Sequence, residues 1–275
     1  HVLVCGARAI EARAPSFRAA GVVPFFVFAL QPGTALSDRH EAVRHAMLEA
    51  SSAVIDARGD DVLSELLSQL EASLESEHDA VTARAGVLVG RAAGCRPAGS
   101  APVRRVVERL LSALRTPSEL VQEAVASCLP ALVRASAAAK DVPSIVDRLF
   151  VDLLHGDKYA TRRGAAYGLA GVVKGRGVSA IRELRILARL SEAAHDTSTT
   201  TTRQGALFAY ELLASTLHVL LEPYVDGILA DLLLCFGDTH ADVREATQDA
   251  ARVLMRSLSG QCLKLILPSL LDGLD

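Results

Sequence analysis

Residues 158–177 read KYATRRGAAYGLAGVVKGRG and carry the pattern that decides the fold. Gly164, Gly168 and Val172 stand four residues apart, so they form one stripe along a helix. The two glycines let a neighbouring helix approach closely, and the valine fills the deeper part of the contact. The stretch therefore predicts the inner helix of a tightly packed helical hairpin.

The same stripe occurs six times along the chain. Its first positions, which we call anchors, are Ala46, Ala85, Ala124, Gly164, Gly205 and Ala246, at steps of 39, 39, 40, 41 and 41 residues. Three residues before each anchor stands a β-branched residue: Val43, Thr82, Val121, Thr161, Thr202 and Val243. The residue two before each anchor, which we call position −2, is basic in four of the six: Arg44, Ala83, Gln122, Arg162, Arg203 and Arg244.

A second amphipathic segment precedes five of these inner helices. The segments cover residues 61–74, 103–114, 145–154, 183–194 and 225–236. In the turn 116–119, Thr116 is expected to cap the next helix, with Pro117 at its first position and Glu119 closing a capping box. Asp38 with Glu41 suggests the same arrangement earlier in the chain.

The repeat length selects the repeat class. Units of 39 to 41 residues are too long for tetratricopeptide or ankyrin repeats and fit the short end of the HEAT and armadillo range. Two helices per unit and the Val-Arg start favour HEAT repeats. We therefore expect an all-α protein, an α-solenoid (α-α superhelix) of HEAT-type hairpins that stack into one curved core with an extended inner surface.

The expected organisation has three parts. Residues 1–19 are an N-terminal remnant, partly helical or disordered, residues 20–259 form six repeats, and residues 260–275 begin a truncated seventh. The run GVVPFFVFAL at 21–30 resembles the apolar part of a signal peptide, but Pro24 interrupts it and it is shorter than a membrane helix needs. We expect it to be the buried first helix of a repeat, in a chain cut from a longer protein.

Composition limits the function classes. Half of the residues are hydrophobic, 22% are charged and only 4% are aromatic, which predicts a folded helical protein rather than a β-sandwich. A net charge of −3 excludes attraction of the whole chain to nucleic acid. The five cysteines form no CxxC pair and are expected to be reduced core thiols: Cys5, Cys95, Cys128, Cys235 and Cys262.

No catalytic or metal site is predicted, and no cofactor. Five histidines lie near turns of different repeats, where stacking would keep them too far apart to share a metal: His40, His78, His155, His195 and His240. The glycines of residues 171–177 (GVVKGRG) suggest a phosphate loop, but a preceding strand and a Gly-Lys-Ser/Thr end are missing, so Gly175 or Gly177 should end a helix. Residues 196–202 (DTSTTTT) predict a solvated turn, with phosphorylation as an alternative role.

One band of the chain is strongly basic. Between residues 158 and 189 eight basic residues face one acid, Glu183, whereas residues 60–79 and 222–249 hold seven acids each. The basic residues are Lys158, Arg162, Arg163, Lys174, Arg176, Arg182, Arg185 and Arg189. We predict that Lys158, Arg162, Arg163, Lys174 and Arg176 border one ridge that contacts ribosomal RNA, with a merely solvated face as the alternative.

The sequence also resembles a known family, through motifs that occur in one order. Besides residues 158–177, these are residues 121–133 (VQEAVASCLPALV), 203–211 (RQGALFAYE), 222–225 (EPYV), 232–238 (LLLCFGD), 243–245 (VRE) and 264–271 (KLILPSLL). They resemble the giant HEAT-repeat translational activators of general amino-acid control, which bind ribosomes and partner the kinase of initiation factor two. The resemblance covers about residues 20–275, whereas residues 1–19 match nothing we recognise.

The resemblance implies a function and partners. It implies a cytoplasmic, non-enzymatic scaffold segment of a ribosome-binding regulator, in a region shared with fungal elongation factor three. The implied partners are the ribosome, an ABC-class ATPase and, through regions outside this chain, the initiation-factor-two kinase. The alternative function is a HEAT-repeat adaptor for nuclear transport or phosphatase assembly.

Overall fold

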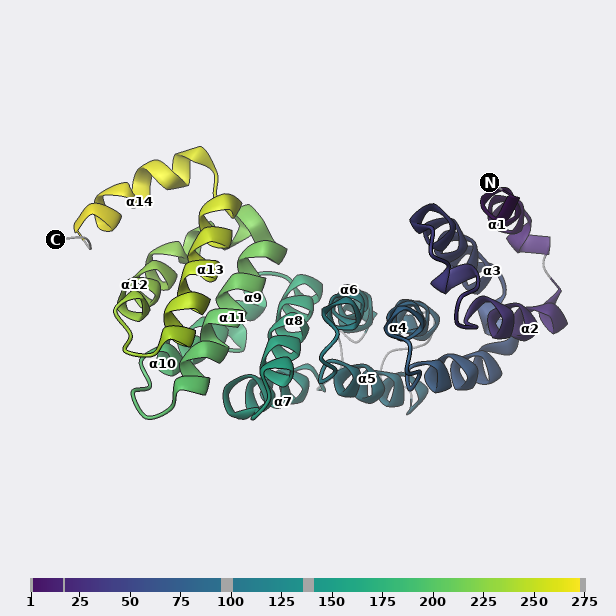
Figure 1. The fold of residues 1–275 in the computed structure, drawn as a ribbon, viewed down its shortest axis with the longest axis horizontal. Helices are drawn as coiled ribbons and strands as arrows, with labels where there is room; N and C mark the ends of the chain where they lie inside the picture. Colours follow the sequence, from purple (N-terminus) through teal and green to yellow (C-terminus); the bar gives the residue numbers. More distant parts are fainter. Residues whose placement is uncertain (1, 17, 95–100, 136–140, 273–275) are drawn as a thin grey trace. The chain divides into compact units, whose positions relative to one another are not determined.

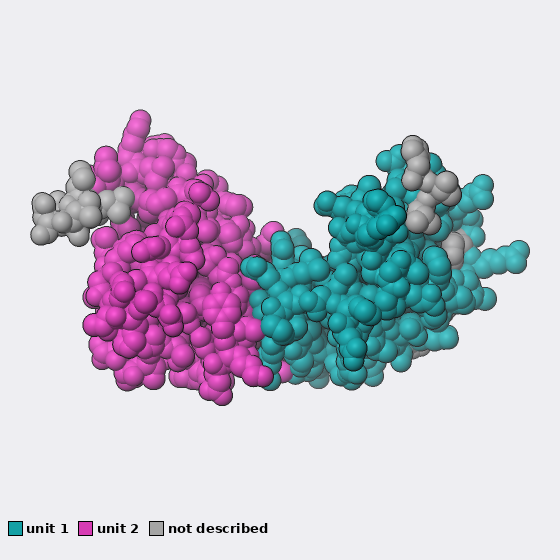
Figure 2. Space-filling model, viewed as in Figure 1, with its two compact units in different colours: residues 1–139 teal, residues 140–275 magenta. Residues whose placement is uncertain are grey.

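The computed structural model describes residues 2–16, 18–94, 101–135 and 141–272. Within these ranges the chain forms α-helices and three short 3-10 helices, with no strand, which confirms the all-α HEAT-repeat prediction. The chain divides into two compact units, residues 1–139 and 140–275 (Figure 2).

The described residues of unit 1 form six α-helices and two 3-10 helices. They are α1 (Val2–Arg13), η1 (Ala14–Ser16), α2 (Ala19–Ala29), η2 (Ala35–Ser37), α3 (Glu41–Ser73), α4 (Asp79–Gly94), α5 (Ala101–Ala113) and α6 (Glu119–Ala135). Helix α3 packs against α1, α2 and α4, and α4 packs in turn against α6. Most of the N-terminal remnant predicted for residues 1–19 is therefore helical and packed.

Unit 2 holds the remaining hairpins. Its elements are α7 (Asp141–His155), α8 (Tyr159–Arg176), α9 (Ser179–Glu183), α10 (Ile186–Ala194), α11 (Thr200–Leu217), η3 (His218–Tyr224), α12 (Val225–Phe236), α13 (Ala241–Ser257) and α14 (Gly260–Asp272). Helices α8, α11 and α13, each the second helix of a hairpin, lie side by side with α11 in the middle (Figure 1).

The six-fold stripe is buried as predicted. Every anchor, and every residue four and eight positions after it, is buried except Ala124, which is half-buried. The absence of a side chain at Gly205 permits the closest approach, because a Cβ there would lie 2.1 Å from the carbonyl oxygen of Leu153 on α7. The stripe thus sets how closely the helices pack.

Two predicted helix boundaries were wrong. The inner helix around Ala46 and the segment 61–74 are one continuous helix, α3, because only Gly59 interrupts the sequence between them and a glycine weakens a helix without breaking its hydrogen bonds. The segment 183–194 is instead divided into α9 and α10 at Arg185, whose φ of 50° is left-handed.

The predicted helix starts need correction as well. Helix α6 begins at Glu119, and the carbonyl of Ser118 accepts the first helical bonds, so Thr116 does not cap the helix and Pro117 lies before it. At α3, His40 is the N-cap residue, and Asp38 accepts a hydrogen bond from the His40 N–H. The Asp38 carboxylate thus bonds within the turn and does not cap the helix.

Two burial predictions were also only partly right. Cys128, Cys235 and Cys262 are buried, but Cys5 is exposed, and Cys95 lies outside the described residues. Burial raises the pKa of the Cys128 thiol to about 12. Helix α2 buries Val22 and Phe26 but leaves Phe28 exposed, and no described helix is long and apolar enough to span a membrane.

Candidate functional site

Polar side chains at position −2 close the turn in five of the six repeats; the other has Ala83 there, and Thr82 donates to the Ser76 carbonyl oxygen instead. In α8, Arg162 Nη1 donates to the carbonyl oxygens of Gly156 at 2.8 Å and Asp157 at 3.2 Å. The same kind of bond, to carbonyls four to eight residues upstream, is made by Arg44, Gln122, Arg203 and Arg244. Position −2 therefore satisfies carbonyl groups of the turn that follows the preceding helix.

Arg162 is consequently a buried structural residue. It is 6% exposed, and its Nη2 donates to Gln204 Oε1 on α11 at 2.6 Å. Burial lowers the pKa of this guanidinium. Of the five residues predicted to contact RNA, Arg162 is thus engaged within the protein.

Arg163 links α8 to α11. Both of its terminal nitrogens bind the Glu211 carboxylate, with Nη2 at 2.8 Å from Oε1, and the two side chains are only 14% and 13% exposed. Its guanidinium carbon also lies 5.4 Å from the centre of the Phe208 ring. Burial lowers the pKa of Arg163, but the hydrogen bond to Glu211 and its negative charge outweigh that effect. The pKa of Arg163 is therefore raised, and the side chain stays charged.

The other three predicted residues are exposed at the two ends of α8. Lys158 is its N-cap residue, and Lys174 and Arg176 lie in its last turn. Sixteen residues of helix, or about 24 Å, separate Lys158 from Lys174. Arg176 Nη2 lies 3.8 Å from the Glu183 carboxylate. The five residues bracket α8 as predicted, but only these three face solvent.

A smaller group of basic residues gathers where α8 ends and α9 begins. Lys174, Arg176 and Arg182 are exposed there, and we call them the α8–α9 basic cluster. The two remaining members of the basic band are engaged elsewhere: Arg185 with Glu192 at 3.6 Å, and Arg189 with Asp147 at 2.8 Å. Basic residues also suit this place because the C-terminal end of a helix is electronegative.

Residues 171–177 form the predicted helix terminus. Gly177 has a φ of 95° and its N–H donates to the Val173 carbonyl oxygen at 2.9 Å, so it ends α8. Gly175 lies inside the helix and is buried. Of the two candidates, Gly177 therefore ends the helix.

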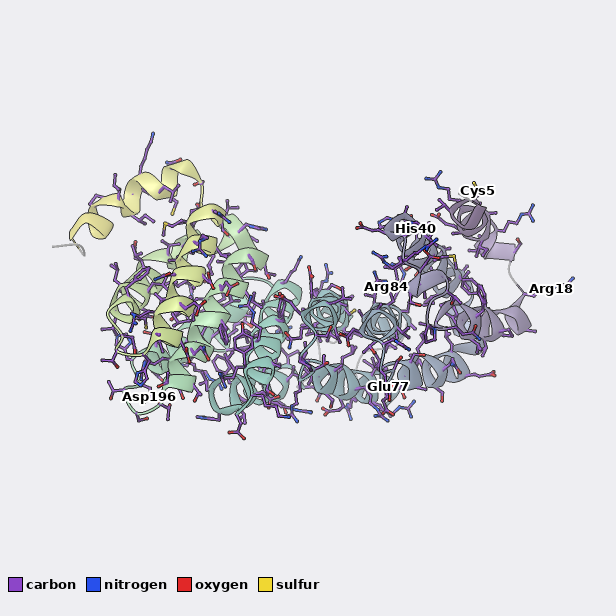
Figure 3. The ribbon with its side chains drawn as sticks, in the orientation of Figure 1. Cys5, Arg18, His40, Glu77, Arg84 and Asp196 are labelled. Carbon is purple, nitrogen blue, oxygen red and sulfur yellow. The ribbon has the colours of Figure 1, made fainter. Side chains whose placement is uncertain are left out.

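The turn predicted for residues 196–202 is shorter than expected, because α11 begins at Thr200 and Thr202 is buried. Residues 196–199 form the turn, which is organised by Asp196, labelled in Figure 3. Its carboxylate accepts bonds from the Ser198 N–H at 2.8 Å, the Ser198 hydroxyl at 2.6 Å and the Thr199 hydroxyl at 2.9 Å. These bonds, led by that of the Ser198 hydroxyl, hold the pKa of Asp196 below its usual value. Among the described residues no group of His, Cys, Asp and Glu is arranged to hold a metal ion.

A buried carboxylate joins three helices of unit 2. Asp231 on α12 accepts hydrogen bonds from the Tyr210 hydroxyl on α11 and, at 3.0 Å, from the Ser191 hydroxyl on α10. Burial and the hydrogen bond to Asp231 raise the pKa of Tyr210 well above its usual value. The carboxylate thus ties α10, α11 and α12 to one another.

Sequence reasoning missed a groove on the α8, α11 and α13 face. Its volume is about 390 Å³, and Tyr159, 57% exposed, forms one edge by packing edge-to-face on Phe208 with ring centres 5.1 Å apart. Helix α13 contributes Asp242, Glu245 and Asp249 to the lining. Their spacing of three and four residues could have predicted an acidic face on this helix. It could not predict the groove, because the groove combines residues from three repeats about forty residues apart.

Two family models divide most of the chain between them. The model for Stalled ribosome sensor GCN1, HEAT repeats, matches residues 5–93, and the model for the EF3 N-terminal HEAT repeat matches residues 162–275. The first match begins at residue 5, so the expectation that residues 1–19 resemble nothing known was wrong for most of that segment.

Individual relatives agree with the family models. The chain is 43% identical over 259 residues to the human Stalled ribosome sensor GCN1, and 34% identical over 268 residues to the eIF-2-alpha kinase activator GCN1 of Saccharomyces cerevisiae. These alignments cover 92% and 97% of the chain but 10% of each relative. Elongation factor 3 of Gonapodya prolifera is 30% identical over 115 residues, 42% of the chain and 10% of that protein.

The matches and the repeat geometry lead to one assignment. The chain spans about a tenth of the length of the GCN1 relatives that it matches. Its motifs, its six-fold stripe and its all-helical hairpins agree with both family models. The chain belongs to the GCN1-like family of HEAT-repeat translational activators.

Proposed function

We propose that this chain is a scaffold segment of a ribosome-binding translational regulator that supports activation of the initiation-factor-two kinase. The observation that carries the proposal is the 43% identity, over 92% of the chain, to a protein named as a stalled ribosome sensor. A cytoplasmic place and the absence of catalysis by the chain itself belong to the proposal. The match to elongation factor 3 supports a role in translation for residues 162–275.

The α8–α9 basic cluster is the proposed contact with ribosomal RNA. Its three side chains are exposed on a chain whose net charge is negative, so the local field and not the total charge would attract phosphate. Lys158 would make a separate contact at the other end of α8. Arg162 and Arg163 would act indirectly, by holding the turn and the neighbouring helix in place.

The other partners follow from the family. An ABC-class ATPase would bind the same segment, and the kinase would bind regions outside this chain. Nothing in the geometry favours a transport or phosphatase adaptor over this function.

Ribosome co-sedimentation tests the proposal directly. The parent chain should pellet with purified ribosomes, and the triple variant Lys174→Glu, Arg176→Glu, Arg182→Glu should pellet several-fold less at physiological salt. The logarithm of the binding constant falls linearly with the logarithm of the salt concentration. Losing about three phosphate contacts should make this slope shallower by roughly 0.7 to 0.9 per contact. The control Arg8→Glu, Arg256→Glu, Lys264→Glu makes the same charge change at exposed positions outside the cluster.

Two outcomes would count against the proposal. If the parent chain does not pellet with ribosomes, this segment is not the ribosome-binding part. If the cluster variant and its control pellet like the parent, the RNA contact lies elsewhere. A circular dichroism spectrum of each variant establishes that the helices are intact.

A further inference from the structure

The groove between α8, α11 and α13 has an unpaired donor in its lining. Arg162 lines the groove and is 94% buried, and two of its nitrogens are bound by turn carbonyls and Gln204. Its Nε–H, however, has no acceptor among the residues that the structure describes. This nitrogen is itself buried beneath the groove surface, so the groove is offered to a ligand by its exposed side chains and not by this donor.

The wall formed by α13 is acidic. Asp242 and Glu245 are exposed, and the Asp242 carboxylate lies close enough to Arg162 to favour its charge. Asp249 shares its charge with Arg252, whose Nη1 lies 2.5 Å from Oδ1. Against these three carboxylates the lining holds one guanidinium, that of Arg162, so the groove attracts cations.

The opposite edge of the groove is aromatic. Tyr159 is 57% exposed and is held edge-to-face against Phe208, beside which Arg163 already lies. An exposed ring next to carboxylates suits an arginine side chain, whose flat guanidinium stacks on the ring and donates to the acids. A nucleic acid could stack on the ring, but its phosphates would face the acids of α13.

We propose that this groove binds an extended, arginine-rich segment of a protein partner. One arginine of the segment lies between Tyr159 and the carboxylates of α13, stacked on the ring and paired with Asp242 and Glu245. Along α8 the groove residues Tyr159 and Arg162 lie about 18 to 22 Å from Lys174, so the peptide and the proposed RNA contact occupy different places. The proposal does not depend on ribosome binding.

Binding of a defined probe tests the proposal. The probe is a fluorescein-labelled peptide, Gly-Ser-Arg repeated three times, titrated with the 275-residue chain and followed by anisotropy at physiological salt. The variant Asp242→Asn, Glu245→Gln, Asp249→Asn should weaken binding by roughly tenfold, since each exposed charge pair contributes modestly. The control Glu183→Gln, Glu192→Gln, Asp226→Asn removes three exposed acids of unit 2 outside the groove and should change affinity less than twofold.

The aromatic edge supplies a second, independent readout. Tyr159→Ala should weaken binding by about two- to fivefold, whereas Tyr159→Phe keeps the ring and should bind like the parent. The ribosome variant of the α8–α9 basic cluster should bind the peptide with unchanged affinity. This result separates the groove from the proposed function, because either can fail alone.

Three results would overturn the proposal. Equal weakening by the groove variant and its control would mean that the peptide only senses total charge. Parent-like binding by both the groove variant and Tyr159→Ala would place the peptide elsewhere. Displacement of the peptide by a ten-residue uridine oligonucleotide, lost in the groove variant, would assign the groove to RNA.

Discussion

Gly205 should be intolerant of even a methyl group, because its backbone touches the backbone of another helix. A Cβ at this position would lie 2.1 Å from the Leu153 carbonyl oxygen and 3.0 Å from its carbonyl carbon. No rotamer change can relieve a clash with a backbone, so α11 would have to move away from α7. Overpacking of this kind costs about 1–3 kcal/mol, against roughly 1 kcal/mol gained when alanine replaces glycine in a helix. Taking the upper cost for so short a distance, we expect Gly205→Ala to lose about 2 kcal/mol.

Gly86→Ala is the matched control for this prediction. A Cβ there would meet Val125 at 3.6 Å and Leu74 at 3.8 Å, which are ordinary contacts, so the change should stabilise by about 0.5–1 kcal/mol. Urea unfolding followed by far-ultraviolet circular dichroism compares the two midpoints with that of the parent. A raised midpoint for Gly205→Ala would show that α11 and α7 are not as close as described.

Two further predictions concern charged groups at the turns. Arg203→Met should lose about 3 kcal/mol in the same urea experiment, because it leaves the largely buried Asp238 carboxylate, now 2.6 Å from Arg203 Nε, without its cation. Arg244→Met, which breaks only bonds to turn carbonyls, should lose about 1 kcal/mol, and equal losses for the two would contradict this assignment. The lowered pKa of Asp196 means that the folded chain binds fewer protons than the unfolded chain, so its contribution is present above the unfolded pKa and is lost as the pH falls through the lower folded value. The urea midpoint of Asp196→Asn should therefore fall less than that of the parent between about pH 6 and pH 3, and an identical fall would refute the role of the Ser198 and Thr199 bonds.

Position −2 shows how far a pattern predicts a role. The sequence places Arg162 and Arg203 two residues before the anchors Gly164 and Gly205, but the bonds to turn carbonyls appear only when the preceding helix end is in place. Arg163 is the next residue along the chain and carries the same charge as Arg162. Its inward orientation follows from the position of Glu211, 48 residues away.

Helix boundaries show the same division. The stripe predicted every inner helix, yet it could not show that α3 continues through Gly59, because a single glycine permits both a turn and a continuous helix. Nor could it place the break at Arg185, which lies in a segment of unbroken helical periodicity.

The sequence by itself determined the repeat, the helical class and the family, because a stripe of small residues recurring about every forty residues has one efficient way to bury itself: against the helices of its own and neighbouring hairpins. It also located the charge, since the net charge of a segment needs no coordinates. Only the tertiary structure decided which charges are available. Arg162 and Arg163 are covered because α11 packs on α8, whereas Asp242 and Glu245 meet Tyr159 across a groove because three hairpins stack side by side. Whether a side chain is exposed, and which side chains it meets, depends on neighbours that are distant in the sequence. Local periodicity contains no information about those neighbours.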